Sequence, residues 1–345
     1  MAQTAKNSNL GKARTAKKDE FYTQLSDIEK ELKHYRDQFA GKVILCNCDD
    51  PWVSNFFHYF SYNFEQLGLK KLLTTCYKNQ NADLFSRSDS ERAIYLEYSG
   101  NRTDGRVPNP EEIGIKHLRG DGDFRSAECI ELLRKADIVV TNPPFSLFRE
   151  YVAQLIEYDK RFLIIGNQNT ITYKECFTFI KDGKMWLGAS IHSGDRWFGV
   201  PDDYPLTAAT HKTDGDGRKY IKVKGVRWFT NMDYRERHED LILYRTYRGH
   251  EQDYPRYDNY DAINVDTTRE IPSDYDGFMG VPITFLDKYN PEQFDIIGSS
   301  ITLAGPMSEL APKGSFLQGG PAFYLANGDG THRRLYHRIV IRRRA

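Results

Sequence analysis

Short apolar runs alternate with amphipathic stretches through the first half of the chain. Short segments rich in apolar residues predict strands over 43–48, 71–77, 93–98, 115–118, 138–141, 162–165 and 185–189, and the nearly continuous apolar runs 138–141 and 162–165 predict buried strands. Apolar residues at helical spacing predict helices over 25–39, 53–67, 128–135, 148–158 and 173–180. Alternating strands and helices predict an α/β fold on a mostly parallel, doubly wound sheet.

The pattern becomes less regular after residue 190. Strands are predicted over 219–223 and 226–230, and the Gly- and Pro-rich stretch 290–345 holds only short apolar runs. Arginines alternate with apolar residues near the end of the chain, which predicts a terminal strand within 333–344. We therefore expect three segments: a basic flexible arm, a catalytic domain and a second module, over 1–18, 19–235 and 236–345.

The predicted strand 138–141 runs directly into Asn142-Pro143-Pro144-Phe145. Each proline fixes its own φ and restricts the residue before it to extended conformations, so this turn is stiff. An amide side chain, free carbonyls and an aromatic ring can accept hydrogen bonds from an exocyclic amine while the ring stacks on the base. The tetrapeptide therefore favours a methyltransferase acting on an amino group, and the alternative is a Pro-Pro turn with a core Phe.

Composition limits the class of protein. With 345 residues, 39% of them hydrophobic, the chain can bury one large core or a large and a smaller one. It has no apolar run of about 18 residues and no signal-peptide core, which predicts a cytoplasmic protein without a membrane segment. Five cysteines without a second zinc-spaced pair predict reduced thiols and no metal site.

Positive charge gathers at both ends of a chain whose net charge is zero. The first 18 residues hold basic side chains and no acid: Lys6, Lys12, Arg14, Lys17 and Lys18. The stretch 333–344 likewise holds only basic charges: Arg333, Arg334, Arg338, Arg342, Arg343 and Arg344. Local basic segments on a neutral chain favour contacts with nucleic-acid phosphates, and the alternative is a solubilising tail at each end. We expect the arm to order on DNA.

Three further motifs follow predicted strands. Asp49 and Asp50 lie in a turn without glycine and either bind a cationic group or cap the next helix, where Pro51 fits the first turn. Asp123 and Phe124 either contact an adenine ring or form a tight acidic turn. The pair Trp228-Phe229 either forms a second wall against a base or packs in the core.

Five motifs occur in a fixed order along the chain: Asp19-Glu20-Phe21-Tyr22-Thr23-Gln24, Cys46-Asn47-Cys48-Asp49-Asp50-Pro51, Ser54-Asn55-Phe56-Phe57, Cys76-Tyr77-Lys78-Asn79 and Thr141-Asn142-Pro143-Pro144-Phe145-Ser146. This ordered set resembles the EcoRI-type adenine-specific DNA methyltransferases, the modification partners of restriction endonucleases. The similarity is most specific over 19–185 and continues through 228–231 into the C-terminal module. The first turn departs from the usual pattern because it lacks glycine, and 72–77 lacks the acid that holds the cofactor ribose in many relatives.

The resemblance implies a Rossmann-like methyltransferase sheet with a C-terminal target-recognition module, using S-adenosylmethionine to methylate adenine N6 in double-stranded DNA by base flipping. It implies protection of a GAATTC-like site against a cognate restriction enzyme, with no obligate protein partner. The implied cofactor-binding residues are Phe21, Tyr22, Thr23, Asn47, Asp49, Asp123 and Phe124. The implied catalytic residues are Asn142, Pro143, Pro144 and Phe145. From residue type and charge rather than from the resemblance, we predict that Phe229 stacks on the base and that Lys12, Arg14, Lys17 and Lys18 contact DNA.

Two other functions stay open at this point. The same kind of turn serves methylation of the cytosine N4 amine and of a glutamine amide in a protein. The first turn without glycine also allows a DNA-binding regulator on an inactive methyltransferase scaffold. Analysis of the methylated nucleosides distinguishes adenine methylation from the first alternative. Binding of S-adenosylmethionine distinguishes an active enzyme from an inactive scaffold.

Overall fold

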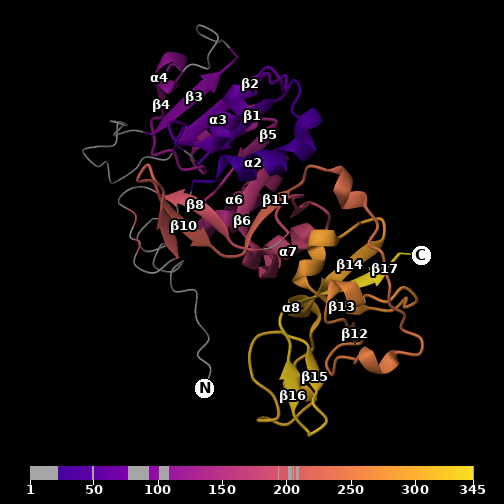
Figure 1. Cartoon of the computed structure of the whole chain (residues 1–345). Coiled ribbons are helices and arrows are strands. Elements are labelled where there is room, and N and C mark those ends of the chain that lie inside the picture. The colour runs from indigo at the N-terminus through magenta and orange to yellow at the C-terminus, as the bar shows by residue number, and fades with distance from the viewer. Residues whose placement is uncertain are drawn as a thin grey trace. The chain divides into compact units, whose positions relative to one another are not determined.

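A computed structural model describes residues 22–48, 50–76, 93–100, 109–192, 194–200, 204, 206 and 210–344 (Figure 1). The chain divides into two compact units. The N-terminal unit comprises Met1–Gln168 and Ser193–Asp233, and the C-terminal unit comprises Asn169–His192 and Tyr234–Ala345. This division differs from the segments expected from the sequence mainly in 169–192, whose helix α7 (Lys174–Lys181) packs on strand β14 (Phe294–Ser299) of the C-terminal unit.

The N-terminal unit is built on a sheet with the strand order β4-β3-β2-β1-β5-β6-β11. These strands are β1 (Val43–Asn47), β2 (Lys71–Cys76), β3 (Ile94–Tyr98), β4 (Lys116–His117), β5 (Ile138–Thr141), β6 (Arg161–Asn167) and β11 (Val226–Thr230). The central strands β2, β1, β5 and β6 are parallel, as the apolar runs predict. Pairs β3–β2, β4–β3 and β11–β6 are antiparallel. The sheet is therefore mixed, and the prediction of a mostly parallel sheet holds only for its centre.

Helices lie where amphipathic stretches predict them in this unit. They are α2 (Leu25–Leu32), continued by the 3-10 helix η1 (Lys33–Gln38), α3 (Asn55–Tyr62), α5 (Ala127–Lys135) and α6 (Phe148–Glu157). Helices α3 and α5 begin at serine caps, Ser54 and Ser126, whose side chains accept hydrogen bonds from backbone N–H groups of the first turn. A short helix, α4 (Pro110–Ile113), lies in a stretch whose glycines and prolines predict a loop, and an Asn109–Glu112 capping box starts it.

The first residue of α6 packs closely against the sheet. Phe148, the first residue of α6, is 1% exposed, and its ring centroid lies 5.0 Å from that of Phe229 on β11. A Cβ on Gly166 of β6 would lie 2.4 Å from the Phe148 ring. Glycine is therefore required there, and this contact also holds the turn that precedes α6.

Replacing Gly166 with alanine should lower the free energy of unfolding by about 1–3 kcal/mol, because the added methyl overpacks the Phe148 ring. Denaturant titration measures the change. Gly215→Ala is the matched control, since its Cβ would have no neighbour within 4 Å. Equal stability of the two variants would contradict close packing at Gly166.

A separate antiparallel sheet follows in the N-terminal unit, with the order β8-β10-β9. Its strands are β8 (Arg196–Val200), β9 (His211–Thr213) and β10 (Lys219–Val223). A tight turn with Gly225 in the left-handed region (φ 67°) connects β10 to β11. Strand β11 then enters the main sheet and pairs antiparallel with β6, with Val226 opposite Asn167.

The C-terminal unit contains a sheet with the order β12-β13-β17-β14 and a separate hairpin, β15–β16. The strands are β7 (Trp186–Leu187), β12 (Ile263–Asn264), β13 (Met279–Pro282), β14, β15 (Tyr324–Ala326), β16 (His332–Arg334) and β17 (Arg338–Arg343), with helices α7 and α8 (Ser300–Leu303). The 3-10 helices are η3 (Gln168–Thr172), η4 (Arg235–His238), η5 (Glu251–Asp253), η6 (Thr268–Glu270), η7 (Ile283–Lys288) and η8 (Met307–Glu309), with η2 (Phe145–Leu147) in the N-terminal unit. Strand β17 confirms the predicted terminal strand.

Among the helices of the described ranges, none combines the length and the apolar character that a membrane span requires.

Candidate active site

The ends of two neighbouring parallel strands bring two asparagines to one edge of the sheet. Strands β1 and β5 pair in parallel with Leu45 opposite Val139, so both chains leave the sheet at the same edge, after Asn47 and Thr141. The Thr141 hydroxyl donates a hydrogen bond to the Asn47 carbonyl. Asn142 directly follows Thr141. Ligands of open α/β sheets bind at this carboxyl edge.

The turn after β5 is held firmly and leaves one ring accessible. Asn142 is 7% exposed, and the Pro144 carbonyl accepts a hydrogen bond from the Leu147 N–H at 3.0 Å, which starts η2. Phe145 is only partly buried, whereas Phe148 fills the core. The alternative of a core phenylalanine therefore describes Phe148, while the Phe145 ring retains surface for a planar partner.

The turn after β1 forms without glycine. Cys48 has φ 69°, in the left-handed region that non-glycine residues seldom adopt, and so it takes the conformation that glycine usually supplies. Asp50 accepts a hydrogen bond from the Trp52 N–H at 2.9 Å, and Ser54, rather than an aspartate, caps α3. Partial burial raises the pKa of the Asp50 carboxyl above its ordinary value. The capping alternative is therefore wrong for Asp50, and Asp49 lies outside the described residues.

The segment before α2 is fixed beside this turn. Tyr22 exchanges two backbone hydrogen bonds with Gly199 of β8, at 2.8 and 2.9 Å. The Asn55 side chain, in the first turn of α3, donates to the Thr23 carbonyl at 2.7 Å. The Thr23 hydroxyl is buried and has no hydrogen-bond partner among the described residues. A buried hydroxyl at this position is available to a bound molecule. Phe21 lies outside the described residues.

Asp123 and Phe124 lie in a tight acidic turn, which was the alternative to a contact with an adenine ring. Asp123 accepts from the Arg125 guanidinium at 2.9 and 2.6 Å and from the Arg125 N–H at 2.8 Å. The Arg125 hydrogen bonds lower the pKa of the Asp123 carboxyl below its ordinary value. Phe124 is 6% exposed and packs edge-on against Tyr151 at 5.0 Å. The carboxylate retains exposure for a ligand, whereas the Phe124 ring offers mainly an edge.

Helix α6 joins these loops. The Tyr151 hydroxyl donates to the Asn47 side-chain oxygen, and the Gln154 side chain donates to the Phe124 carbonyl at 3.2 Å. Glu150 accepts from Arg125 at 2.8 Å. The helix that follows the Asn142 turn therefore orients the Asn47 amide and anchors the acidic turn. Sequence reasoning missed these residues, although Tyr151 and Gln154 lie at i, i+3 spacing on one helix face directly after the motif.

Replacing Tyr151 with phenylalanine should lower the free energy of unfolding by about 1–3 kcal/mol, because it leaves the buried Asn47 oxygen without this donor. Thermal or denaturant unfolding measures the loss. Tyr244→Phe is the control, because the Tyr244 side chain is 80% exposed. A loss for Tyr151→Phe no larger than that of the control would show that the hydroxyl does not hold Asn47.

The Phe229 ring is fully buried and cannot stack on a base. It is 0% exposed on β11, and neighbouring Trp228 is 1% exposed, with its ring 6.0 Å from that of Phe56. A ring without exposed surface has no face for a base, so the core-packing alternative applies and the stacking role predicted for Phe229 is corrected. Predicted DNA contacts in the arm fall outside the described residues: Lys12, Arg14, Lys17 and Lys18.

Comparisons with known proteins identify the family of the chain. The sequence profile of a family described as "Adenine-specific methyltransferase EcoRI" matches residues 9–344. "Type II methyltransferase M.EcoRI" of Escherichia coli is 53% identical over 297 residues, covering 86% of this chain and 90% of that protein. "Type II methyltransferase M.MpnI" of Mycoplasma pneumoniae is 37% identical over 340 residues, covering 97% and 98%. No solved structure gives a significant match.

A second mycoplasma protein extends this likeness over nearly the whole chain. "Type II methyltransferase M.MgeORF184P" of Mycoplasma genitalium is 36% identical over 341 residues, which cover 97% of this chain and 98% of that protein. The family profile and the relatives favour adenine in DNA over cytosine or a protein amide. The chain belongs to the EcoRI-type family of adenine-specific DNA methyltransferases.

Proposed function

We propose that this adenine-specific DNA methyltransferase binds an adenine flipped out of duplex DNA in the turn Asn142–Phe145 and methylates its N6 amine from S-adenosylmethionine. The observation that carries the proposal is the position of this turn at the end of β5, beside Asn47 at the end of β1. One edge of the sheet thus offers a polar turn for the base next to loops suited to a cofactor.

The proposed chemistry follows from the target amine, whose lone pair is conjugated with the adenine ring and is therefore a poor nucleophile. Hydrogen bonds from the amine to the Asn142 side-chain oxygen and the Pro143 carbonyl draw the nitrogen toward sp³ geometry and orient its lone pair. Phe145, which is only partly buried, stacks on the flipped base. Positioning and electrostatics supply most of the rate, and no covalent enzyme intermediate is needed.

S-adenosylmethionine, when bound, supplies a methyl group on a positively charged sulfur. The buried Thr23 hydroxyl supports a ligand at the methionine end, because it has no partner among the described residues. Tyr22 directly precedes Thr23, whose carbonyl accepts from Asn55, and Asn47 at the end of β1 accepts from the Tyr151 hydroxyl. Asp123 is proposed to accept from the cofactor adenine amine, with the Phe124 edge beside the ring. Phe21 and Asp49 complete the proposed set by motif alone.

We further propose a GAATTC-like site and protection against a cognate restriction enzyme. The support is the 53% identity with a protein named Type II methyltransferase M.EcoRI. Basic residues of the arm would contact phosphates of the duplex, which provide affinity without sequence information. They are Lys12, Arg14, Lys17 and Lys18.

Two measurements test the proposal. Calorimetric titration with S-adenosylmethionine should show binding, and an inactive scaffold should show none. Plasmid DNA incubated with protein and cofactor should then resist a restriction enzyme that cuts GAATTC, and long-read sequencing should find modified adenine at those sites. Modification at an unrelated sequence would overturn the proposed site but not the activity. Absence of cofactor binding would overturn the proposed cofactor.

A further inference from the structure

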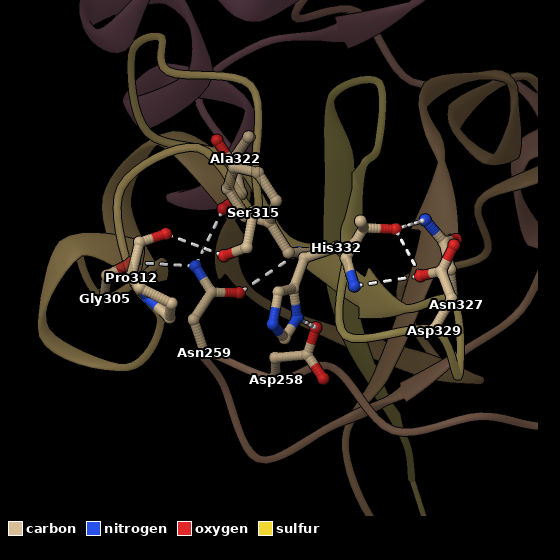
Figure 2. A network of polar contacts seen from close by, with 11 residues as sticks. Asp258, Asn259, Gly305, Pro312, Ser315, Ala322, Asn327, Asp329 and His332 are labelled. Carbon is tan, nitrogen blue, oxygen red and sulfur yellow. Dashed lines mark hydrogen bonds and ion pairs between the residues drawn. The ribbon is translucent and has the colours of Figure 1, made fainter.

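The hairpin β15–β16 and the loop before it form one clamped element, residues 305–336, which we call the hairpin module. Figure 2 shows Asn259 at its base: the side-chain nitrogen donates to the carbonyls of Gly305 at 2.7 Å and Ala322 at 2.8 Å. The side-chain oxygen of Asn259 accepts from the Tyr324 N–H at 3.1 Å. Asp258 contacts His332 Nδ1 at 2.8 Å. These contacts fix the module to the segment that precedes β12.

Contacts within the module hold its loop against the hairpin. The Ser315 carbonyl accepts from the His332 N–H at 2.8 Å, and the Tyr324 hydroxyl donates to the Leu317 carbonyl at 2.9 Å. At the hairpin tip, Asp329 accepts from the Thr331 N–H at 2.9 Å. The outer side chains are therefore presented on a preorganised backbone, which reduces the entropy lost on binding.

The module contains both exposed apolar side chains and positive charges without an ion pair among the described residues. Leu317 is 75% exposed and Tyr336 is 92% exposed. Lys313 and Arg333 are exposed and make no ion pair with any residue that the structure describes. Arg334 donates to the Gly320 carbonyl at 3.2 Å. The module holds two acids, Glu309 in η8 and Asp329 at the tip, and four cations: Lys313, Arg333, Arg334 and His332 when it is protonated.

The structure separates these cations from the other arginines near the end of the chain. Arg338 pairs with Asp266 at 3.3 Å, and Asp295 pairs with Arg342 at 3.4 Å and with Arg344 at 2.8 Å. Their charge is already compensated inside the C-terminal unit. Lys313 and Arg333 differ from these three arginines, because no ion pair with a described residue compensates their charge and exposed apolar side chains lie in the same module.

We propose that the hairpin module is a DNA-reading surface of this enzyme, with Lys313 and Arg333 on phosphates and Leu317 and Tyr336 against base edges in a groove. The proposal rests on the proposed duplex substrate. Charge complementarity selects a polyanion, and apolar side chains recognise thymine methyl groups or enter between base steps. A two-stranded ribbon fits the major groove of B-form DNA. The module thus supplies both affinity and sequence discrimination.

The charged half of the proposal is tested with the double variant Lys313→Gln/Arg333→Gln. Its affinity is measured over a salt series on a duplex fragment that the wild-type protein methylates. The slope of log affinity against log salt should fall by about 1.8, since each phosphate contact contributes about 0.9. A slope lower by about 1.8 corresponds to an affinity loss of about 30-fold at 0.15 M salt, relative to a 1 M reference. Arg342→Gln, which removes a cation already paired with Asp295, should leave the slope unchanged.

The apolar half is tested with Leu317→Ala and Tyr336→Ala. Each should reduce the ratio of specific to nonspecific affinity by roughly fivefold or more, the smallest effect of a lost base contact, while nonspecific affinity stays constant. Ile242→Ala is the control, because Ile242 is 67% exposed elsewhere in the C-terminal unit. In all variants, the rate of methyl transfer at saturating DNA should equal that of the wild type. The affinity for the cofactor should also be unchanged.

Wild-type salt slopes and specificity ratios in the module variants would overturn the inference while leaving the methyltransferase assignment intact. A wild-type protein that methylates no DNA would instead overturn the proposed function. Circular dichroism and thermal unfolding establish that each variant is folded. A uniform loss of affinity in the module variants and in both controls would also refute the inference, because it would show no special role for the module.

Discussion

Replacing Asn142 with alanine is expected to lower single-turnover methyl transfer by about 10²- to 10³-fold, the usual effect of losing one preorganised polar group at the reacting centre. The side chain is 7% exposed directly after β5, and we propose that its oxygen accepts from the target amine. Rapid-quench kinetics with methyl-labelled S-adenosylmethionine and a duplex substrate measures the step directly.

Binding of S-adenosylmethionine should be unchanged in Asn142→Ala, because the proposed cofactor contacts come from other loops. Ser146→Ala is the matched control: Ser146 is exposed, four residues along the same turn, and its loss should leave the rate within a factor of about two to three, as expected for a surface substitution. Near-full transfer by Asn142→Ala would remove the turn from the catalytic mechanism.

Replacing Phe145 with alanine is expected to weaken capture of the flipped adenine. The ring is only partly buried, so most of its loss falls on the base rather than on the core. Stacking of a base on an aromatic side chain is worth about 1–3 kcal/mol, which corresponds to a loss of roughly 5- to 150-fold in kcat/KM. Steady-state kinetics over a range of duplex concentrations measures it.

Phe145→Trp serves as the control, since it keeps an aromatic face and should retain most of the activity. The free energy of unfolding of both variants separates stacking from packing. If Phe145→Ala lost stability like a core variant but kept its kcat/KM, then Phe145 would be a packing residue and the base would be held elsewhere.

The centre of the sheet could be predicted because its strands leave a strong local signal. Strand β5 is buried along its whole length, as its continuous apolar run requires, and two prolines after it restrict the next turn. The same logic places Asn47 at the end of β1. The sequence thus predicted that both asparagines follow buried strands, and the pairing of β1 with β5, which brings them to one edge, is known from the structure.

The edges of the sheet could not be predicted in the same way. An apolar run is compatible with either strand direction, so β3 and β11 were recognised as strands while their antiparallel pairing was not. Direction depends on the path of the chain between two paired strands, and between β6 and β11 that path is the long segment 168–225. The direction in which two strands pair depends on both segments, so the sequence of one segment does not predict it.

Details of the site depended on tertiary contacts. The left-handed backbone at Cys48 replaces the expected glycine, and nothing in the local sequence shows that the fold imposes it. Phe229 was assigned to the base because aromatic residues suit both stacking and cores, and the burial that decides between them comes from Phe148 on another element. Tyr151 lay outside the motif, although its hydroxyl orients Asn47.

The most direct test of the account is the chemical identity of the product. Duplex plasmid is incubated with methyl-labelled S-adenosylmethionine and either wild-type protein or Asn142→Ala, then digested to nucleosides and analysed by mass spectrometry. The account predicts labelled N6-methyldeoxyadenosine from the wild type and a product lower by orders of magnitude from the variant. Label in N4-methyldeoxycytidine, label in protein, or equal N6-methyldeoxyadenosine from both proteins would contradict it.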